Sequence, residues 1–202
     1  MLLCVITFAP ACAAQSNRPA LVPDNATLLS AIASVVAKQE TYPKDAKAQV
    51  EVTAGGPGEI AIGGERRILV PVYIHFQGVD NSYCRLAVFD PAKSSAELIP
   101  LPTDADHDHC QGMRRIAVVD LNHDGITDFV YQVTIPSNRY AATVTEGAVY
   151  LSKPSAKTYC YSAAASRVVT SDVPPQTAMV RKAIDAEVAR LGPKVFDCAG
   201  LK

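Results

Sequence analysis

The sequence has no tryptophan, almost no net charge and no apolar run long enough to span a bilayer, which takes about 20 residues. Among its 202 residues, 19 are basic and 20 are acidic, so the formal net charge is −1. A nucleic-acid-binding protein normally shows a basic excess or a basic stripe, and neither is present. We therefore expect no nucleic acid among the partners.

Several motifs that carry chemistry are also missing from the chain. It contains no GxSxG, SxxK or HExxH motif and no glycine-rich phosphate loop. No pair of cysteines has the CxxC spacing of zinc ribbons and thioredoxin-like proteins. These absences disfavour an enzyme without excluding one, because catalytic triads are assembled in space rather than along the sequence.

The first fourteen residues are uncharged and predict an export signal. Residues 1–14 read MLLCVITFAPACAA, with small residues at the end where a signal peptidase would cut. A second interpretation is a lipoprotein signal, in which Cys12 becomes the lipid-anchored first residue. Both interpretations predict a periplasmic or secreted protein with a linker over 15–23 and a single domain over 24–202.

Four cysteines remain after cleavage at either point, and an exported chain is expected to pair them. We favour two disulfides that join neighbours in sequence, although spacing alone leaves three connectivities open. The favoured pairs are Cys84–Cys110 and Cys160–Cys198.

Apolar spacing predicts a helix near each end of the mature chain and strands between them. The helices are expected over Asn25–Glu40 and from Pro174-Pro175 to about Leu191. Pro71, inside the first long apolar segment, predicts an edge strand or a bulge there. We expect an α+β fold in which one antiparallel sheet, flat or strongly curved, carries a helix from each end. The expected strands are Ile68–Phe76, Tyr83–Phe89, Arg115–Val119, Phe129–Ile135, Ala142–Leu151 and Thr158–Ser162.

The segment DLNHDGITD, from Asp120 to Asp128, has the composition of a calcium loop. Oxygen-bearing side chains occupy loop positions one, three, five and nine, and a main-chain carbonyl would serve at position seven. Gly125 at position six allows the sharp bend around an ion. Carboxylates at this density repel one another without a cation between them. The predicted Ca²⁺ ligands are Asp120, Asn122, Asp124, Ile126 and Asp128.

This loop resembles known calcium loops of two kinds. It is close to an EF-hand loop, but Tyr131 stands at position twelve instead of the bidentate glutamate, and its flanks look like strands. It is more similar to the DxNxDGxxD loops of FG-GAP and VCBS repeats, which join two strands. Because the bidentate glutamate is missing, we expect weak calcium binding, and an ion at a hairpin tip is expected to be structural rather than catalytic. A single copy of the loop carries over no propeller fold. The alternative interpretation is a polar turn that hydrogen-bonds its own backbone.

A second polar cluster lies in Asp104-Ala105-Asp106-His107-Asp108-His109, directly before Cys110. Alternate residues of an extended segment share a face, so its carboxylates and imidazoles could bind a transition metal or catalyse hydrolysis. A solvated loop beside a disulfide is the plainer interpretation.

The leading hypothesis is an exported calcium-binding protein that acts by binding another protein. Its sharpest version is a periplasmic inhibitor or immunity protein against a cell-wall-degrading enzyme such as a lysozyme. The chain is similar in kind to bacterial lysozyme inhibitors, which are exported, compact, β-rich and disulfide-bearing, but it shares no motif with them. The alternatives are a hydrolase that uses the cluster Asp104–His109 and a calcium-rigidified structural module of the envelope.

Overall fold

The computed structural model describes most of the chain after residue 24. The described residues are 25–39, 47–53, 56–78, 82–101, 109–136, 143–169 and 176–198. The predicted signal peptide, the linker and Cys12 lie outside this set.

The first half of the chain forms sheet A, an antiparallel sheet of five strands. The strand order is β1-β3-β4-β5, and β2 pairs with the first half of β3 while β1 pairs with its second half. One face of the sheet is covered by helix α1 (Asn25–Gln39), which buries Leu28, Ile32 and Val36 at helical spacing. The strands are β1 (Ala48–Val52), β2 (Gly58–Ile62), β3 (Glu65–Phe76), β4 (Ser82–Asp90) and β5 (Ser95–Leu98).

Pro71 lies inside β3, where a proline would normally remove a ladder hydrogen bond. It falls between the stretch of β3 that pairs with β2 and the stretch that pairs with β1. Its carbonyl accepts a hydrogen bond from Thr53 N at 2.9 Å, just past the end of β1. The predicted edge strand or bulge is therefore wrong: β3 lies between β4 on one side and β1 and β2 on the other, and Pro71 falls where β3 changes partner strand.

The second half of the chain forms sheet B, an antiparallel meander of four strands in the order β6-β7-β8-β9. Its outer face is covered by helices α2 (Ala163–Val168) and α3 (Thr177–Leu191) and by the 3-10 helix η3 (Gly192–Phe196). The strands are β6 (Gly112–Val119), β7 (Asp128–Pro136), β8 (Thr143–Lys153) and β9 (Thr158–Tyr161), with the short helix η2 (Pro154–Ala156) between the last two.

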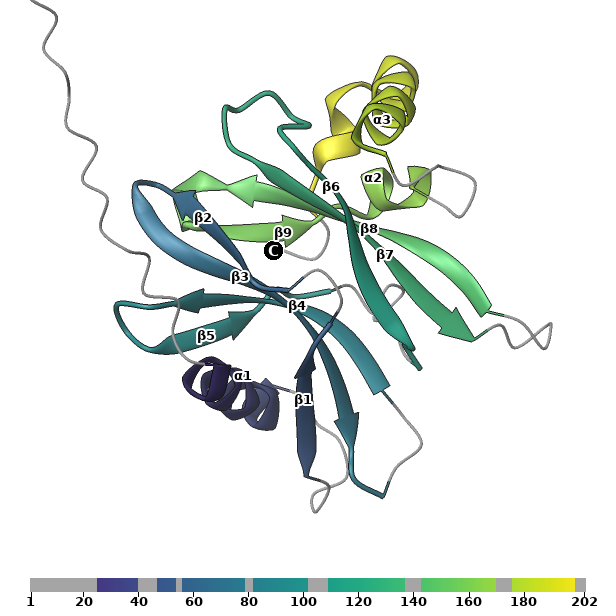
Figure 1. Cartoon of the computed structure of the whole chain (residues 1–202). Coiled ribbons are helices and arrows are strands. Elements are labelled where there is room, and N and C mark those ends of the chain that lie inside the picture. Colours follow the sequence, from purple (N-terminus) through teal and green to yellow (C-terminus); the bar gives the residue numbers. More distant parts are fainter. Residues whose placement is uncertain are drawn as a thin grey trace, which may run out of the picture.

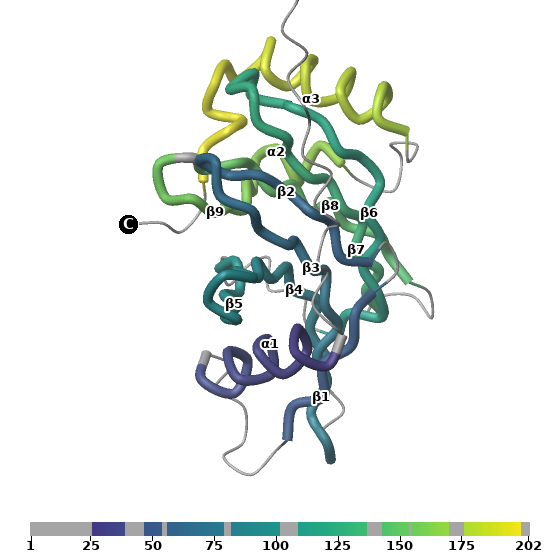
Figure 2. The backbone as a smooth tube through the Cα atoms, turned by 60° about the vertical axis from the view of Figure 1, so that its left-hand side comes forward, coloured from purple at the N-terminus to yellow at the C-terminus, as the bar shows by residue number. Residues whose placement is uncertain are grey.

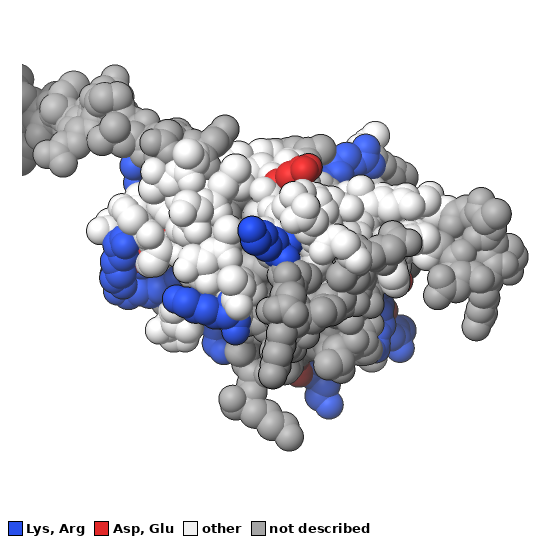
Figure 3. All heavy atoms as spheres, turned by 90° about the horizontal axis from the view of Figure 1, so that it is seen from below, with Lys and Arg blue, Asp and Glu red and all other residues white. Residues whose placement is uncertain are grey.

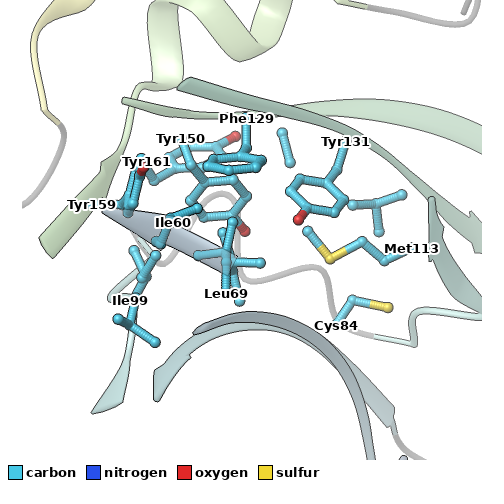
Figure 4. Close-up of a cluster of buried hydrophobic side chains, with 14 of the residues drawn as sticks. Ile60, Leu69, Cys84, Ile99, Met113, Phe129, Tyr131, Tyr150, Tyr159 and Tyr161 are labelled. Atoms are coloured by element: carbon cyan, nitrogen blue, oxygen red, sulfur yellow. The ribbon is translucent and has the colours of Figure 1, made fainter. Parts of the chain in front are cut away.

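The two sheets pack face to face, so the molecule has four layers: α1, sheet A, sheet B and the C-terminal helices. Figure 1 shows α1 below sheet A and α2 and α3 above sheet B, and the second view agrees (Figure 2). The inter-sheet core combines aliphatic side chains of sheet A with aromatic ones of sheet B (Figure 4). Its tyrosines meet edge to face, for example Tyr131 on Tyr150 with ring centroids 5.9 Å apart.

The α+β class, the antiparallel strands and the six expected strand segments are confirmed. The expectation of one sheet is wrong, because β6, which begins at Gly112, starts a second sheet instead of extending the first. The strands β1, β2 and β5 and the helix α2 were not predicted individually.

Both favoured disulfides are present. Cys84 of β4 is joined to Cys110, just before β6, with Cα atoms 5.7 Å apart, so this bridge links sheet A to the entry of sheet B. Cys160 of β9 is joined to Cys198 after η3, with Cα atoms 5.6 Å apart. Two disulfides are consistent with an oxidising, extracytoplasmic compartment.

None of the helices in the described ranges is long and apolar enough to cross a membrane. The face seen from below, where α1 lies, shows basic side chains separated by uncharged surface rather than a continuous basic stripe (Figure 3).

Candidate metal centre

The loop predicted to bind calcium connects β6 to β7 at one tip of sheet B. Val119 and Asp128 are the last paired residues of the two strands, so the loop proper runs from Asp120 to Thr127. The flanking elements are strands, as expected for an FG-GAP-like loop rather than an EF-hand. Residues 120–128 thus form a hairpin tip whose shape depends on its own polar groups.

Three of the predicted ligands lie together and bond the loop's main chain. Asp120 accepts hydrogen bonds from the N–H groups of Asp124 at 3.2 Å and Gly125 at 3.0 Å. The Asn122 carbonyl oxygen also accepts from Asp124 N, at 3.2 Å. Asp124 in turn accepts from Ile126 N at 2.8 Å. Side-chain oxygens of all three residues therefore bond N–H groups of the loop itself.

Two residues of the loop adopt left-handed backbone conformations that permit this inward turn. Gly125 has φ of 82°, and no heavy atom lies within 4 Å of the position that a Cβ would occupy there. The glycine is required by the backbone angle and not by crowding. His123, with φ of 59°, occupies a region in which histidine is tolerated better than most residues. His123 is exposed to solvent.

Asp128 closes the loop from below. Its side chain is fully buried and accepts Leu121 N at 2.8 Å and Ser152 N of β8 at 2.7 Å. The pKa of this carboxyl is raised from 3.8 to about 6, chiefly by burial and to a smaller extent by the charge of Asp124, while the N–H donors of Ser152 and Leu121 act to lower it. Asp128 is thus a buried acid with a like-charged neighbour.

Contacts from outside the loop hold it against sheet B and α3. Ser152 Oγ donates to Asp124 Oδ2 at 2.6 Å, and Tyr159 OH donates to the carbonyl of Thr127 at 2.9 Å. Arg181 of α3 donates to the main-chain carbonyl of Asp120 at 2.9 Å. Its guanidinium therefore bonds the backbone and makes no ion pair with the loop carboxylates.

The loop offers the kind of donor that a hard cation takes, namely side-chain and main-chain oxygen. Side-chain oxygens of Asp120, Asn122, Asp124 and Asp128 gather in one short loop, and the main chain at Ile126 belongs to the same turn. Calcium takes six to eight oxygen ligands, so water would complete the shell. Within the described ranges, no three His, Cys, Asp or Glu side chains already form a compact metal-binding group. The hydrogen bonds within the loop are also those of a self-bonded polar turn, the alternative interpretation.

Tyr131, at the position of the missing glutamate, lies in the inter-sheet core with a fully buried side chain. It points into the protein interior and is no ligand. Burial raises its pKa, and the nearby Arg115 opposes that rise.

The second predicted cluster falls mostly outside the described residues, which exclude 102–108. His109 is described, is exposed and has φ of 54° beside the Cys84–Cys110 disulfide. His75 of β3 has a buried Nδ1 without a hydrogen-bond partner in the described part of the chain. The sequence held no signal for this orphaned atom.

Comparison with known proteins places the chain in no family: no family model, no curated protein and no solved structure matches it.

Proposed function

We propose that this is an exported protein in which one Ca²⁺ stabilises the β6–β7 tip, and that it acts by binding another protein. The ion would be held by the side chains of Asp120, Asn122, Asp124 and Asp128 and by the carbonyl of Ile126. Its role is structural: it supplies positive charge where the fold concentrates carboxylates.

One observation carries the calcium proposal. The buried carboxylate of Asp128 lies close enough to Asp124 for the second charge to raise its pKa. In the described part of the chain, no lysine, arginine or histidine forms an ion pair with either carboxylate. A buried charge without a counter-charge is costly, and a divalent cation would remove that cost.

The expected size of the effect follows from ligand linkage. The loop lacks a bidentate glutamate, so we expect a Kd of order 10⁻⁵ to 10⁻³ M. With calcium at about 100 times Kd, stability should rise by about 2.7 kcal/mol. For a chain of 202 residues, this corresponds to a rise in Tm of roughly 5 to 10 °C.

The experiment is a pair of thermal melts of the mature chain, one in excess chelator and one in 10 mM CaCl₂. Asp124→Asn should abolish the calcium-dependent rise in Tm. The matched control is Asp185→Asn, at an exposed position on α3, which should keep the full rise. Identical melts of the unmodified chain with and without calcium would refute the proposal.

The protein-binding role is supported by likeness of class to exported inhibitors and by the compact disulfide-linked sandwich. A cell-wall-degrading enzyme is the first partner to test. The immobilised chain should retain a muramidase from a periplasmic extract and inhibit it in a turbidity assay. Full muramidase activity at saturating protein would rule out the inhibitor hypothesis while leaving the calcium proposal in place.

A further inference from the structure

A second feature, away from the calcium loop, is a cleft lined by residues of both sheets. It has a volume of about 550 Å³ and lies between β1 of sheet A and the strands β6, β7 and β8 of sheet B. This volume is typical of sites for small molecules. Its walls combine apolar surface with the polar side chains of Glu51, Tyr73, Arg114, Gln132 and Thr134.

The cleft has opposite charges on its two sides, and they do not contact each other. Glu51 of β1 is exposed and has no hydrogen bond or ion pair with any described residue. Arg114 of β6 is exposed and donates from Nη2 to Gln132 Oε1 at 2.9 Å, but pairs with no carboxylate in the described ranges. No ion pair within 4.0 Å joins these two residues. Opposite charges that share a cleft without pairing are complementary to a ligand that carries both signs.

Gln132 adds a second, independent feature. Its side chain comes from the middle of β7, and the residue is only 7% exposed. Oε1 accepts the bond from Arg114, whereas the Nε2 group has no acceptor in the described part of the chain and is not one of the atoms sealed from solvent. Because the residue lines the cleft, its unused N–H donors are available there. A nearly buried amide with unused donors indicates a ligand acceptor at this position.

We infer that this cleft binds short zwitterionic peptides of about dipeptide size. Arg114 and the Gln132 amide donate to the terminal carboxylate, which an arginine fork recognises through paired hydrogen bonds. Glu51 on the other side accepts from the terminal ammonium group. An apolar side chain of the peptide packs against the ring of Tyr73. A dipeptide carries its ammonium and carboxylate groups at opposite ends, so it can reach Glu51 and Arg114 at the same time although these two side chains do not contact each other.

The test is isothermal titration of the full mature chain with L-alanyl-L-phenylalanine and with its N-acetyl and C-amide derivatives. The free dipeptide should bind at one site, and each blocked derivative should bind at least tenfold more weakly. Arg114→Gln and Glu51→Gln should each weaken binding of the free dipeptide at least tenfold. Glu51→Gln should leave the affinity for the N-acetyl derivative unchanged, because that derivative has no ammonium group for Glu51 to contact.

Matched controls are Lys182→Gln and Asp185→Asn, exposed positions on α3, which lies on the outer face of sheet B. Both should bind the dipeptide as the unmodified chain does. Circular dichroism melts verify that the cleft variants fold. Absence of heat with 10 mM dipeptide, or equal affinity for free and blocked forms, would overturn the inference. So would competition for the cleft by a neutral sugar such as tri-N-acetylchitotriose.

Discussion

Replacing Asp128 by asparagine isolates the buried charge at the base of the β6–β7 loop. In the native state its carboxyl has a pKa of about 6, compared with 3.8 when exposed, chiefly because the side chain is buried. Asparagine has nearly the same shape but cannot ionise. Its altered hydrogen bonding to Leu121 N and Ser152 N adds an offset that does not change with pH over this range.

The sign of the pH effect follows from proton linkage. Between pH 3.8 and about 6 the native state binds more protons at this site than the unfolded state does, so stability falls as pH rises. A difference of about two pKa units corresponds to roughly 3 kcal/mol. In chelator, the stability of the unmodified chain relative to Asp128→Asn should therefore fall by about 3 kcal/mol between pH 3.5 and pH 7.

Urea unfolding of both proteins at half-unit pH intervals measures this difference directly. With saturating calcium the trend should reverse, because the cation favours the ionised carboxylate. A difference between the two proteins that stays constant across the pH range in chelator would refute the reasoning about Asp128.

Three further perturbations test the packing of sheet B. Gly147→Ala should lower the free energy of unfolding by at least about 3 kcal/mol, because the added Cβ would lie 2.1 Å from the carbonyl oxygen of Val169. A urea midpoint equal to that of the unmodified chain within error would contradict this packing. Tyr150→Phe should lower the free energy of unfolding by less than about 1 kcal/mol, or raise it, because the buried hydroxyl has no hydrogen-bond partner among described residues. A loss of about 2 kcal/mol would instead indicate that the hydroxyl is hydrogen-bonded. Replacing both Cys160 and Cys198, which are 38 residues apart, by serine should lower the free energy of unfolding by about 4 kcal/mol, because the unfolded chain is no longer cross-linked. An unchanged melting temperature under oxidising conditions would argue against this disulfide.

Sequence patterns predicted the strands well where burial enforces a long apolar segment. β3 and β4 are buried on both faces over most of their length, and their sequences are correspondingly continuous in apolar residues. That same pattern indicates a sheet covered on both sides, by α1 and by a second sheet. The prediction of one sheet missed this signal because antiparallel meanders look alike whether they continue one sheet or begin another.

The short elements escaped prediction for physical reasons. β5 has four residues and α2 has six, too few for a period of two or 3.6 to emerge. Helix α2 has a local cap from the Ser162 side chain, and it is held in place by tertiary bonds: Val149 N donates to Ser166 Oγ, and Ser162 Oγ donates to the carbonyl of Val195. The calcium loop was recognisable because its oxygen spacing lies within nine consecutive residues. The inter-sheet cleft was not, because Glu51, Arg114 and Gln132 come together only through the packing of two sheets.

The central claim is that the carboxylates of the β6–β7 loop require a divalent cation, and calorimetric titration of the metal-free chain with CaCl₂ tests it most directly. We predict one site with a Kd between about 10⁻⁵ and 10⁻³ M, weaker binding of Mg²⁺, and no binding to Asp124→Asn. Heats indistinguishable from dilution at millimolar calcium would show that the loop is a self-bonded polar turn and would contradict the account.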